Sequence, residues 1–363
     1  MASESGEIQF ICRPDFMCAR QNRQQKFILN TSIPKENLVP FAIVMHAPGG
    51  PDVLKFEEVS VPQPQSHEVV VRHTAIAVNF HDAYVRSGAY KTLELPGVPG
   101  IEAAGVVEAV GADVIDFRPG DRVAYVTKSY GAYAEKRVIS QESLVLLPPN
   151  VSDEVGAAIF LKGLTAQVLI EQVYRVKKGD WVLVHAAAGG VGLLLCQWAR
   201  HLGARVIGTA SSQEKADLAP SAGADEVIVF TQQDFGPEVK RLTDGKGVDV
   251  VYDGVGKATF EKNLDVMRLR GMLVLYGMSS GPVPPVDPAK LSEKGSLYMA
   301  RTTLAHFTAT REELRARSGA LFEMIANGKL KLRIAKTYSL AEAAQAHRDM
   351  EARKIAGKLL LIP

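Results

Sequence analysis

The chain has 363 residues, which is enough for two domains with hydrophobic cores of their own. Its 47% hydrophobic and 23% charged residues are typical of a globular protein and argue against a disordered chain. The 42 Lys and Arg residues nearly balance the 40 Asp and Glu residues, so a net charge of +2 gives no electrostatic case for nucleic acid, and no apolar run reaches the roughly 18 residues of a membrane span.

The cysteine content and the N-terminal segment indicate the setting of the protein. Residues 1–40 lack hydrophobic periodicity and contain no continuous apolar segment of a secretory signal, while their acidic residues argue against an organelle-targeting peptide. We therefore expect residues 1–40 to be a flexible N-terminal extension. Three cysteines cannot form a disulfide framework and indicate a reducing cytoplasm: Cys12, Cys18 and Cys196.

Short β-type segments begin at residue 41 and are separated by prolines. They lie at residues 41–45, 69–71 and 105–110. Their irregular spacing predicts a compact, mostly β, barrel-like domain. A helix predicted at residues 153–169 then carries the chain out of that domain.

Strands and helices alternate between about residues 160 and 300. Strands are predicted at residues 181–185, 206–209, 226–230, 248–253 and 272–276, with helical stretches between them. This alternation predicts an α/β fold with a parallel, doubly wound sheet, of which residues 272–276 are expected to be the final strand.

Two helices, at residues 311–326 and 340–353, and a last strand at 358–362 complete the predicted elements. The last strand comes too late in the chain to belong to the parallel sheet, so we expect it to join the first domain. That domain is then discontinuous, with residues 41–160 and 305–363 on either side of a nucleotide-binding domain at 161–304.

The predicted strand at residues 181–185 runs into a glycine-rich turn and then into a helix-type sequence. Ala186, Gly189 and Gly192 have the spacing of the dinucleotide fingerprint, with alanine at the first glycine position. Such a turn lets the backbone approach a pyrophosphate, whose charge the helix N-terminus favours. An ordinary turn after a buried strand has similar letters, but the following strand and helix favour a nucleotide site.

The second strand of this predicted domain ends without the acidic residue that an NAD site uses to bind the adenosine ribose. Ser211, Ser212 and Lys215 instead offer hydroxyls and a positive charge, which suit the 2′-phosphate of NADPH. The alternative for Lys215 is a solvated lysine at a helix start. The missing acid favours NADPH as the cofactor.

Four segments, at residues 79–88, 99–105, 160–165 and 185–192, together form a specific combination of motifs. The combination resembles the zinc-independent medium-chain dehydrogenases/reductases, and among them the NADPH:quinone oxidoreductases related to zeta-crystallin. The resemblance covers about residues 41–363. It implies a GroES-like, mostly β catalytic domain together with a Rossmann domain, and NADPH-dependent reduction of quinones.

The zinc-dependent branch of this family has a cysteine, a histidine and a third ligand at three positions that can be matched here. They correspond to Asn79, Ile101 and the pair at residues 161–162, and the four closely spaced cysteines of a structural zinc site have no counterpart. We expect His81 to be a loop histidine without a metal role. The resemblance therefore implies reduction without a metal.

Reduction without a metal depends on the placement of the nicotinamide and on hydrogen bonds to the substrate. The resemblance places Asn79, Tyr84 and Tyr90 on a loop that faces the nicotinamide and the substrate, where an amide and two hydroxyls can donate hydrogen bonds. The alternative is that Asn79 caps a turn and that the tyrosines are packing residues.

The resemblance also implies a set of cofactor contacts along the chain. Phe230 stands where close relatives have a tyrosine, Met278 where they often have asparagine, and Val168 where a tyrosine can occur. Phe230 lacks the tyrosine hydroxyl, so we expect it to contact the nucleotide by stacking only. The implied contacts are Phe80, Tyr84, Ala186, Gly189, Gly190, Val191, Gly192, Ser211, Ser212, Lys215, Phe230, Val255, Tyr276, Gly277, Met278, Ser279, Thr302, Thr303, Leu304 and Arg353.

Two other functions stay open at the level of the sequence. The same fold supports NADPH-dependent reduction of activated double bonds in enones, alkenals or enoyl thioesters. A function of another class, as a crystallin-like structural protein or an RNA-binding protein, is weakened by the absence of a basic aromatic cluster.

Residues 295–302 have strand propensity and follow a Gly- and Pro-rich segment at 281–288. An edge strand left open to water invites pairing, and the resembling reductases form a homodimer through this edge. The alternative is a strand covered by helices of the same chain.

Overall fold

The computed structural model describes residues 39–352, 355 and 357–363. The predicted N-terminal extension, apart from its last two residues, therefore lies outside the described residues, as do Cys12, Cys18 and Arg353. Within the described residues, no helix is long and apolar enough to cross a membrane.

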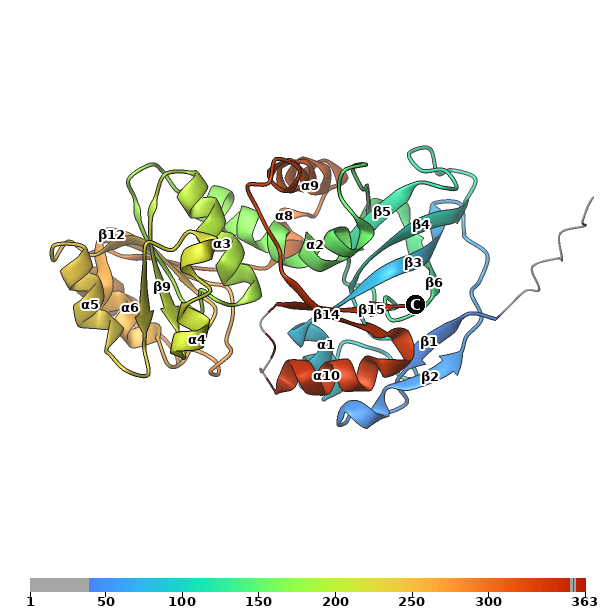
Figure 1. The fold of residues 1–363 in the computed structure, drawn as a ribbon, viewed down its shortest axis with the longest axis horizontal. Helices are drawn as coiled ribbons and strands as arrows, with labels where there is room; N and C mark the ends of the chain where they lie inside the picture. Colours follow the sequence, from blue (N-terminus) through green and yellow to red (C-terminus); the bar gives the residue numbers. More distant parts are fainter. Residues whose placement is uncertain (1–38, 353–354, 356) are drawn as a thin grey trace, which may run out of the picture. The chain divides into compact units, whose positions relative to one another are not determined.

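Strands from the two ends of the described chain form one seven-stranded sheet (Figure 1). Its order is β14-β15-β3-β4-β5-β7, with β6 also paired to β3, and only β14 and β15 are parallel neighbours. The strands are β3 (Glu68–Val78), β4 (Glu102–Val110), β5 (Arg122–Val126), β6 (Lys136–Ser140), β7 (Leu144–Leu146), β14 (Ile334–Ser339) and β15 (Lys358–Ile362), and a separate antiparallel pair is formed by β1 (Phe41–Val44) and β2 (Lys55–Glu58).

The last strand, β15, pairs antiparallel with β3, in the register Leu359 opposite Val78, as expected for a strand that joins the first domain. β3 is much longer than the predicted 69–71. Both faces of β3 are mostly buried, so it lacks the regular alternation of apolar and polar residues that marks a half-exposed strand.

The six-stranded sheet is parallel throughout, in the order β10-β9-β8-β11-β12-β13. The chain builds this sheet outward from β8 in one direction and then from β11 in the other, so the switch point, where ligands bind in such sheets, lies between β8 and β11. The strands are β8 (Trp181–Val184), β9 (Arg205–Ala210), β10 (Glu226–Val229), β11 (Val248–Asp253), β12 (Met267–Leu275) and β13 (Tyr298–Arg301).

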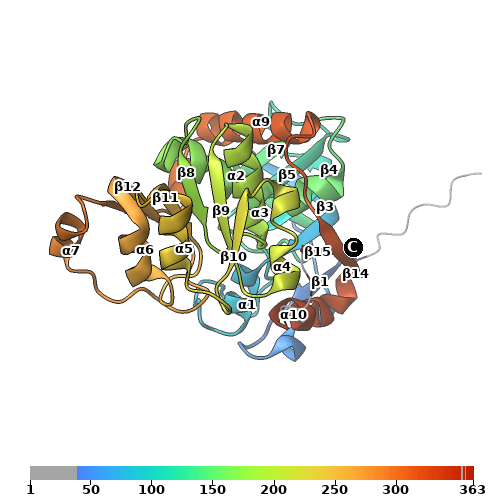
Figure 2. The same ribbon diagram turned by 60° about the vertical axis from the view of Figure 1, so that its left-hand side comes forward.

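Helices cover both faces of the parallel sheet (Figures 1 and 2). Val182 and Val184 pack in one hydrophobic cluster with residues of α3 (Gly190–His201), whereas Leu183 packs in another with residues of α5 (Phe235–Leu242) and α6 (Phe260–Val266). Because successive side chains of a strand alternate between faces, both faces need apolar residues, which explains the continuous apolar runs in the sequence.

The prediction that residues 272–276 form the final parallel strand is wrong. β12 begins at Met267, and β13 pairs with it in parallel from Met272 opposite Tyr298 to Leu275 opposite Arg301. β13 is an edge strand whose side chains are exposed or only partly buried, so it does not have the apolar run of the inner strands.

Helix α2 (Asp153–Val168) joins the two sheets in sequence and has ten buried residues. Six of them belong to the same hydrophobic cluster as residues of both sheets, which explains why a helix at this place is rich in apolar residues: Ala157, Ala158, Ile159, Phe160, Leu164 and Ala166. The predicted domain boundary at residues 160–161 falls inside this helix. The other helices are α1 (Phe80–Arg86), α4 (Gln213–Ala216), α7 (Pro288–Glu293), α8 (Leu304–Phe307), α9 (Arg311–Ala326) and α10 (Ala343–Glu351).

Candidate functional site

The predicted fingerprint turn connects β8 to α3 in a backbone conformation that suits a phosphate. Ala186 has a φ of +52°, in the left-handed region that a first glycine would reach without strain. A Cβ atom on Gly192 would lie 2.3 Å from the carbonyl oxygen of Ala186, so only glycine permits this close approach of helix and turn. The first turn of α3 contains no acidic residue, and its free N–H groups therefore fit a pyrophosphate.

Lys162, which the sequence analysis did not select as a site residue, lies against this turn. Its Nζ atom would be 2.6 Å from a Cβ atom on Gly190, at the first residue of α3. Within the described residues the Nζ atom has no hydrogen-bond or ion-pair partner. A partly buried ammonium without a partner next to a helix N-terminus is arranged to bind an anion.

Burial and two charged groups determine the charge of Lys162. Burial, followed by repulsion from the Lys358 ammonium, lowers the pKa of Lys162 to about 7, against the opposing effect of the Glu102 carboxylate. The side chain therefore changes its charge near neutral pH in the absence of a bound anion. The only sequence signal for Lys162 was its place in one of the four family motifs.

Ser211, Ser212 and Lys215 follow β9 and lie close together, as predicted. Lys215 Nζ is 3.4 Å from Ser211 Oγ, and the Lys215 backbone N–H donates to Ser212 Oγ, also at 3.4 Å. Lys215 has no carboxylate partner in the described part of the chain. Two hydroxyls and an ammonium without a carboxylate partner fit a phosphate group.

The loop after β11 is held by one buried carboxylate. Asp253 Oδ1 accepts hydrogen bonds from the backbone N–H groups of Val255, at 2.6 Å, and Gly256, at 3.1 Å. Its Oδ2 accepts from Thr259 and Asn263, both at 2.7 Å. This loop and the fingerprint turn follow β11 and β8, the two strands at the switch point, so Asp253 fixes a predicted contact, Val255, at the place where the fold binds ligands.

His185, the residue between β8 and the fingerprint turn, stabilises both the turn and the loop after β11. Its Nε2 atom is 2.7 Å from Asn263 Oδ1, and its Nδ1 atom is 2.9 Å from Thr209 Oγ1. Because Asn263 donates its own N–H to Asp253, its oxygen accepts from His185, and Nδ1 then accepts from Thr209. Burial lowers the pKa of His185, which agrees with this neutral tautomer. The side chains of His185, Thr209 and Asn263 are all buried, so they support the turn without contacting a ligand themselves.

The predicted catalytic residues lie on α1 and around it, where the sequence analysis expected a loop. Asn79 precedes the helix, Tyr84 is inside it and Tyr90 follows it. His81 is also helical, so its assignment as a loop histidine is wrong; the Asp82 carboxylate that accepts from the Asn79 backbone N–H, at 2.8 Å, stabilises this helix start.

Asn79 is buried, and its amide group is committed to other residues of the chain. Its Nδ2 donates to Glu102 Oε2 at 2.9 Å, and its Oδ1 accepts from Lys358 Nζ at 2.6 Å. The Lys358 ammonium also contacts Glu102 Oε2 at 2.9 Å, and the Leu161 N–H donates to the other oxygen of Glu102 at 2.6 Å. The Asn79 amide is thus a fixed part of a buried charged cluster, and both its nitrogen and its oxygen already have partners within the chain.

This cluster contains or adjoins in sequence the positions that correspond to metal ligands in the zinc-dependent branch. Asn79 and Glu102, which follows Ile101, accept from the ammonium of Lys358, and the N–H of Leu161, which precedes Lys162, donates to Glu102. A lysine ammonium supplies a positive charge and hydrogen bonds there. Among the residues that the structure describes, no group of three or more His, Cys, Asp or Glu side chains is arranged to hold a metal ion.

Tyr84 and Tyr90 are better placed than Asn79 to donate to a ligand. Their rings contact each other, with centroids 5.3 Å apart, and the His81 ring contacts Tyr90 and stacks on Tyr130 at 6.0 Å. Neither the Tyr84 nor the Tyr90 hydroxyl has a hydrogen-bond partner in the described ranges. Aromatic faces with free hydroxyls suit a planar, oxygen-bearing ring.

The other predicted contacts lie at the ends of parallel strands or on α1. Phe80 is 43% exposed and lines a cavity of about 280 Å³ together with Tyr84 and Glu351, whereas Phe230, after β10, is 45% exposed and free to stack. Arg353 lies outside the described residues. The remaining predicted contacts follow β12 or β13: Tyr276, Gly277, Met278, Ser279, Thr302, Thr303 and Leu304.

A larger cavity, of about 570 Å³, lies between β7 and α9 and contains none of the predicted site residues. Leu144, Leu146, Phe117 and Phe322 give it a largely apolar lining. It offers neither a glycine-rich turn nor a helix N-terminus for a phosphate. The chemistry of the residues therefore favours the fingerprint turn as the cofactor site.

Two family profiles match this chain. Residues 65–149 match the family described as "Alcohol dehydrogenase GroES-like domain", and residues 190–321 match that described as "Zinc-binding dehydrogenase". The first covers most of the antiparallel sheet, and the second covers α3 and the strands β9 to β13.

Curated proteins and solved structures are similar over most of their length. The chain is 48% identical over 315 residues to a quinone oxidoreductase of Pseudomonas aeruginosa, with 87% of this chain and 97% of that protein covered. It is 45% identical over 328 residues to a 2-haloacrylate reductase of a Burkholderia species, with 89% and 98% covered. The Escherichia coli quinone oxidoreductase complexed with NADPH superposes with a TM-score of 0.85 at 44% identity, with 89% of this chain and 100% of that chain covered.

Proposed function

Because the chain belongs to the NADPH:quinone oxidoreductases of the medium-chain dehydrogenase/reductase family, we propose that it reduces quinones with NADPH. The observation that carries the proposal is the fingerprint turn, where the ammonium of Lys162, which has no partner in the described chain, lies against Gly190. The end of β9 supports it, because Ser211 and Ser212 follow the strand directly and the ammonium of Lys215 lies beside Ser211. The pyrophosphate and the 2′-phosphate of the cofactor then each meet a positive charge. An NADPH-complexed relative with the same fold supports this cofactor.

When bound, NADPH supplies the hydride. Lys162 and the first turn of α3 bind the pyrophosphate side of the cofactor, and Asp253 holds the Val255 loop in place next to it. The Tyr84 and Tyr90 hydroxyls donate hydrogen bonds to the quinone oxygens and stabilise the negative charge that develops there. A reduced quinone is a good proton acceptor, so no dedicated strong acid is needed.

Oxidation of NADPH, measured with a panel of electrophiles, tests the reaction. We expect turnover with quinones to exceed turnover with enones, enoyl thioesters and 2-haloacrylate. Addition of EDTA should leave the rate unchanged, because the described residues offer no ligand set for a metal. A preference for an alkene substrate, or loss of activity together with one zinc per chain, would contradict this function.

The charge of Lys162 predicts how cofactor binding depends on pH. Its pKa is about 7 without an anion, and contact with a phosphate raises it, so binding takes up a proton. We expect the Kd for NADPH to rise between pH 7 and pH 9, by up to about tenfold per pH unit. Calorimetric titration in buffers of different ionisation enthalpy measures the proton uptake.

Two variants separate Lys162 from general electrostatics. Lys162→Gln should bind NADPH more weakly at pH 7 and show almost no pH dependence, whereas Lys178→Gln, which changes an exposed lysine, should behave as the wild type. If both variants retain the wild-type pH dependence, Lys162 does not contact the cofactor.

We also propose that the protein is a homodimer joined through β13. Tyr298 and Met299 point to opposite faces of this edge strand and are 58% and 39% exposed, so neither face is covered. Pairing of β13 with its copy across a two-fold axis would remove the open edge.

Substitutions on β13 test the dimer. Tyr298→Pro, which blocks a strand position, and Tyr298→Lys, which adds charge, should both shift the protein toward monomer in sedimentation velocity. Ile115→Lys is the matched control, because Ile115 is also a large exposed apolar residue, at 88%. A wild type that sediments as a monomer at micromolar concentration would rule the dimer out.

The domain boundaries are proposed as residues 41–160 and 305–363 for the GroES-like domain and 161–304 for the Rossmann domain, with α2 crossing between them.

We further propose a cytoplasmic location for the protein. Its three cysteines are too few for a disulfide framework.

A further inference from the structure

The chain passes between its two sheets twice, and the return passage begins with a short helix that has no buried residue. After β13 it continues through Thr302 and Thr303 into α8, which has four residues and none that is buried. A helix of one turn is unstable on its own, since nucleation costs more than one hydrogen bond returns. Something outside α8 must therefore hold it in place.

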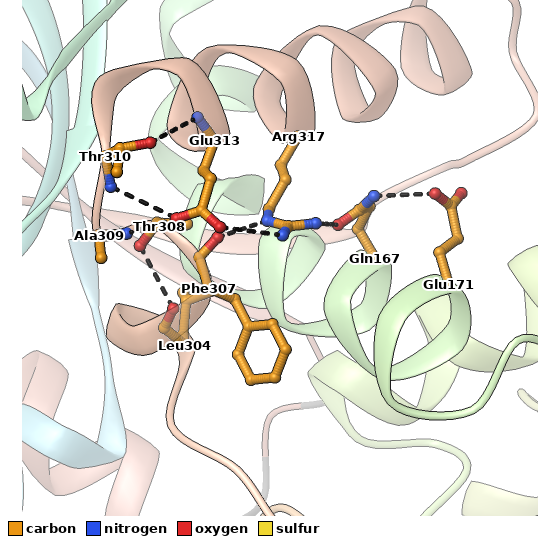
Figure 3. A network of polar contacts seen from close by, with 9 residues as sticks. All are labelled: Gln167, Glu171, Leu304, Phe307, Thr308, Ala309, Thr310, Glu313 and Arg317. Carbon is orange, nitrogen blue, oxygen red and sulfur yellow. Dashed lines mark hydrogen bonds and ion pairs between the residues drawn. The ribbon is translucent and has the colours of Figure 1, made fainter.

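The side chain of Arg317, on α9, supplies that contact (Figure 3). Its Nε donates a short hydrogen bond to the carbonyl oxygen of Phe307, the last residue of α8. Carbonyl groups at a helix C-terminus lack partners within the helix and carry partial negative charge, so a guanidinium stabilises them. The side chain of Arg317 is only 11% exposed, which strengthens this interaction.

The same guanidinium also reaches the outgoing passage, α2. Arg317 Nη1 donates to Gln167 Oε1 at 3.4 Å, and the buried Gln167 in turn donates to Glu171 Oε2 at 2.8 Å. The Nη2 atom of Arg317 lies 3.8 Å from Glu313 Oε1 on α9. The planar guanidinium of Arg317 thus connects the end of α8 with α2. Gln167 is itself held by its hydrogen bond to Glu171.

Glu313 completes the arrangement at the start of α9. Its Oε2 accepts from the backbone N–H groups of Ala309, at 3.2 Å, and Thr310, at 3.4 Å, and its own N–H donates to Thr310 Oγ1 at 3.2 Å. The connection from α8 to α9 is therefore held at both ends, by Arg317 at Phe307 and by Glu313 at Ala309 and Thr310.

We propose that Arg317 is a positioning residue for the cofactor site: it fastens the end of α8 to α2 and thereby holds Thr302, Thr303 and Leu304 at the carboxyl end of β13. This inference rests on the proposed function, which makes these three residues cofactor contacts. The carboxyl ends of parallel strands are where such sheets bind ligands, so loosening α8 loosens one wall of the site.

Hydrogen–deuterium exchange and NADPH titration of Arg317→Met test the role. Met keeps the aliphatic stem but removes all donors. We expect faster exchange at residues 302–310 in the cofactor-free protein and a rise of about tenfold in both Kd and KM for NADPH, the usual effect of one charged hydrogen bond. With saturating NADPH, the KM for the quinone should be nearly unchanged. General destabilisation of the protein would not raise the KM for NADPH alone.

Two further variants provide the controls. Arg317→Lys can still donate to Phe307 but cannot also reach Gln167 in the same geometry, so it should recover part of the affinity. Arg315→Met removes a half-exposed arginine of the same helix, whose partner is Asp116 at 3.1 Å, and should leave exchange at residues 302–310 and NADPH binding unchanged.

The outcomes distinguish this proposal from the proposed function. Unchanged exchange at residues 302–310 in both Arg317 variants would overturn the fastening, and faster exchange with unchanged NADPH affinity would overturn the positioning role. Failure of the wild type to bind NADPH would instead refute the proposed function, while the exchange measurement would still report whether Arg317 fixes the segment.

Discussion

Replacement of Lys358 by Met is expected to lower the free energy of unfolding by about 3 to 5 kcal/mol, the usual cost of removing one partner of a buried ion pair. The side chains of Lys358 and Glu102 are both 0% exposed, and their charged atoms are 2.9 Å apart. Without the ammonium, the Glu102 carboxylate would keep its hydrogen bonds from Asn79 and the Leu161 N–H but would lose its only buried counter-charge within hydrogen-bond distance in the described chain.

Urea denaturation of three variants isolates this effect. Lys336→Met, on the neighbouring strand β14, removes a half-exposed lysine that pairs with Asp349 and should cost no more than about 1 kcal/mol. The double variant Glu102→Gln, Lys358→Met should be more stable than Lys358→Met, because a glutamine amide can donate to the Asn79 oxygen that Lys358 leaves. A cost of less than about 1 kcal/mol for Lys358→Met would contradict a charged pair at this site.

The parallel sheet was predictable because each inner strand is buried on both faces. β8, β9 and β11 need apolar residues on the α3 side and on the α5 and α6 side, and such runs are visible in the sequence. β13 has no such run, since its side chains are largely exposed, and its position became clear only from its pairing with β12.

The family and the α/β fold with a GroES-like domain are confirmed by the comparisons, because the motifs that carry them are short and contiguous in sequence. The fingerprint turn is one such short, contiguous motif. The cluster of Asn79, Glu102 and Lys358 could not be found in this way, because Asn79 and Lys358 are 279 positions apart in the sequence. Only the pairing of β15 with β3 brings them together.

The sequence also did not reveal which predicted donors are free. Asn79 has the residue type of a substrate donor, but its amide is used by Glu102 and Lys358. Among the described residues, the hydroxyls of Tyr84 and Tyr90 and the ammonium of Lys162 have no hydrogen-bond or ion-pair partner. Residue type can be read from the sequence, whereas the hydrogen-bond partners of a buried polar group depend on tertiary contacts.

NADPH is expected to bind well over tenfold more tightly than NADH. Lys215 and the hydroxyls of Ser211 and Ser212 can contact the 2′-phosphate that NADH lacks, and each charged hydrogen bond contributes about 1.5 to 3 kcal/mol. The two residues directly after β9 are Ser211 and Ser212, so the strand end has no acidic side chain to attract a free ribose 2′-hydroxyl. Fluorescence titration of the two cofactors measures the ratio directly.

Lys215→Ala should weaken NADPH binding by about tenfold or more and leave NADH binding nearly unchanged, because only the phosphate contact is lost. Lys246→Ala, which removes an exposed lysine in the turn before β11, is the control for a general change in charge and should preserve the wild-type ratio. The preference for NADPH should also decrease with rising salt concentration, since the ammonium of Lys215 lies near the surface. Equal affinities of the wild type for the two cofactors would show that Ser211, Ser212 and Lys215 do not bind a phosphate.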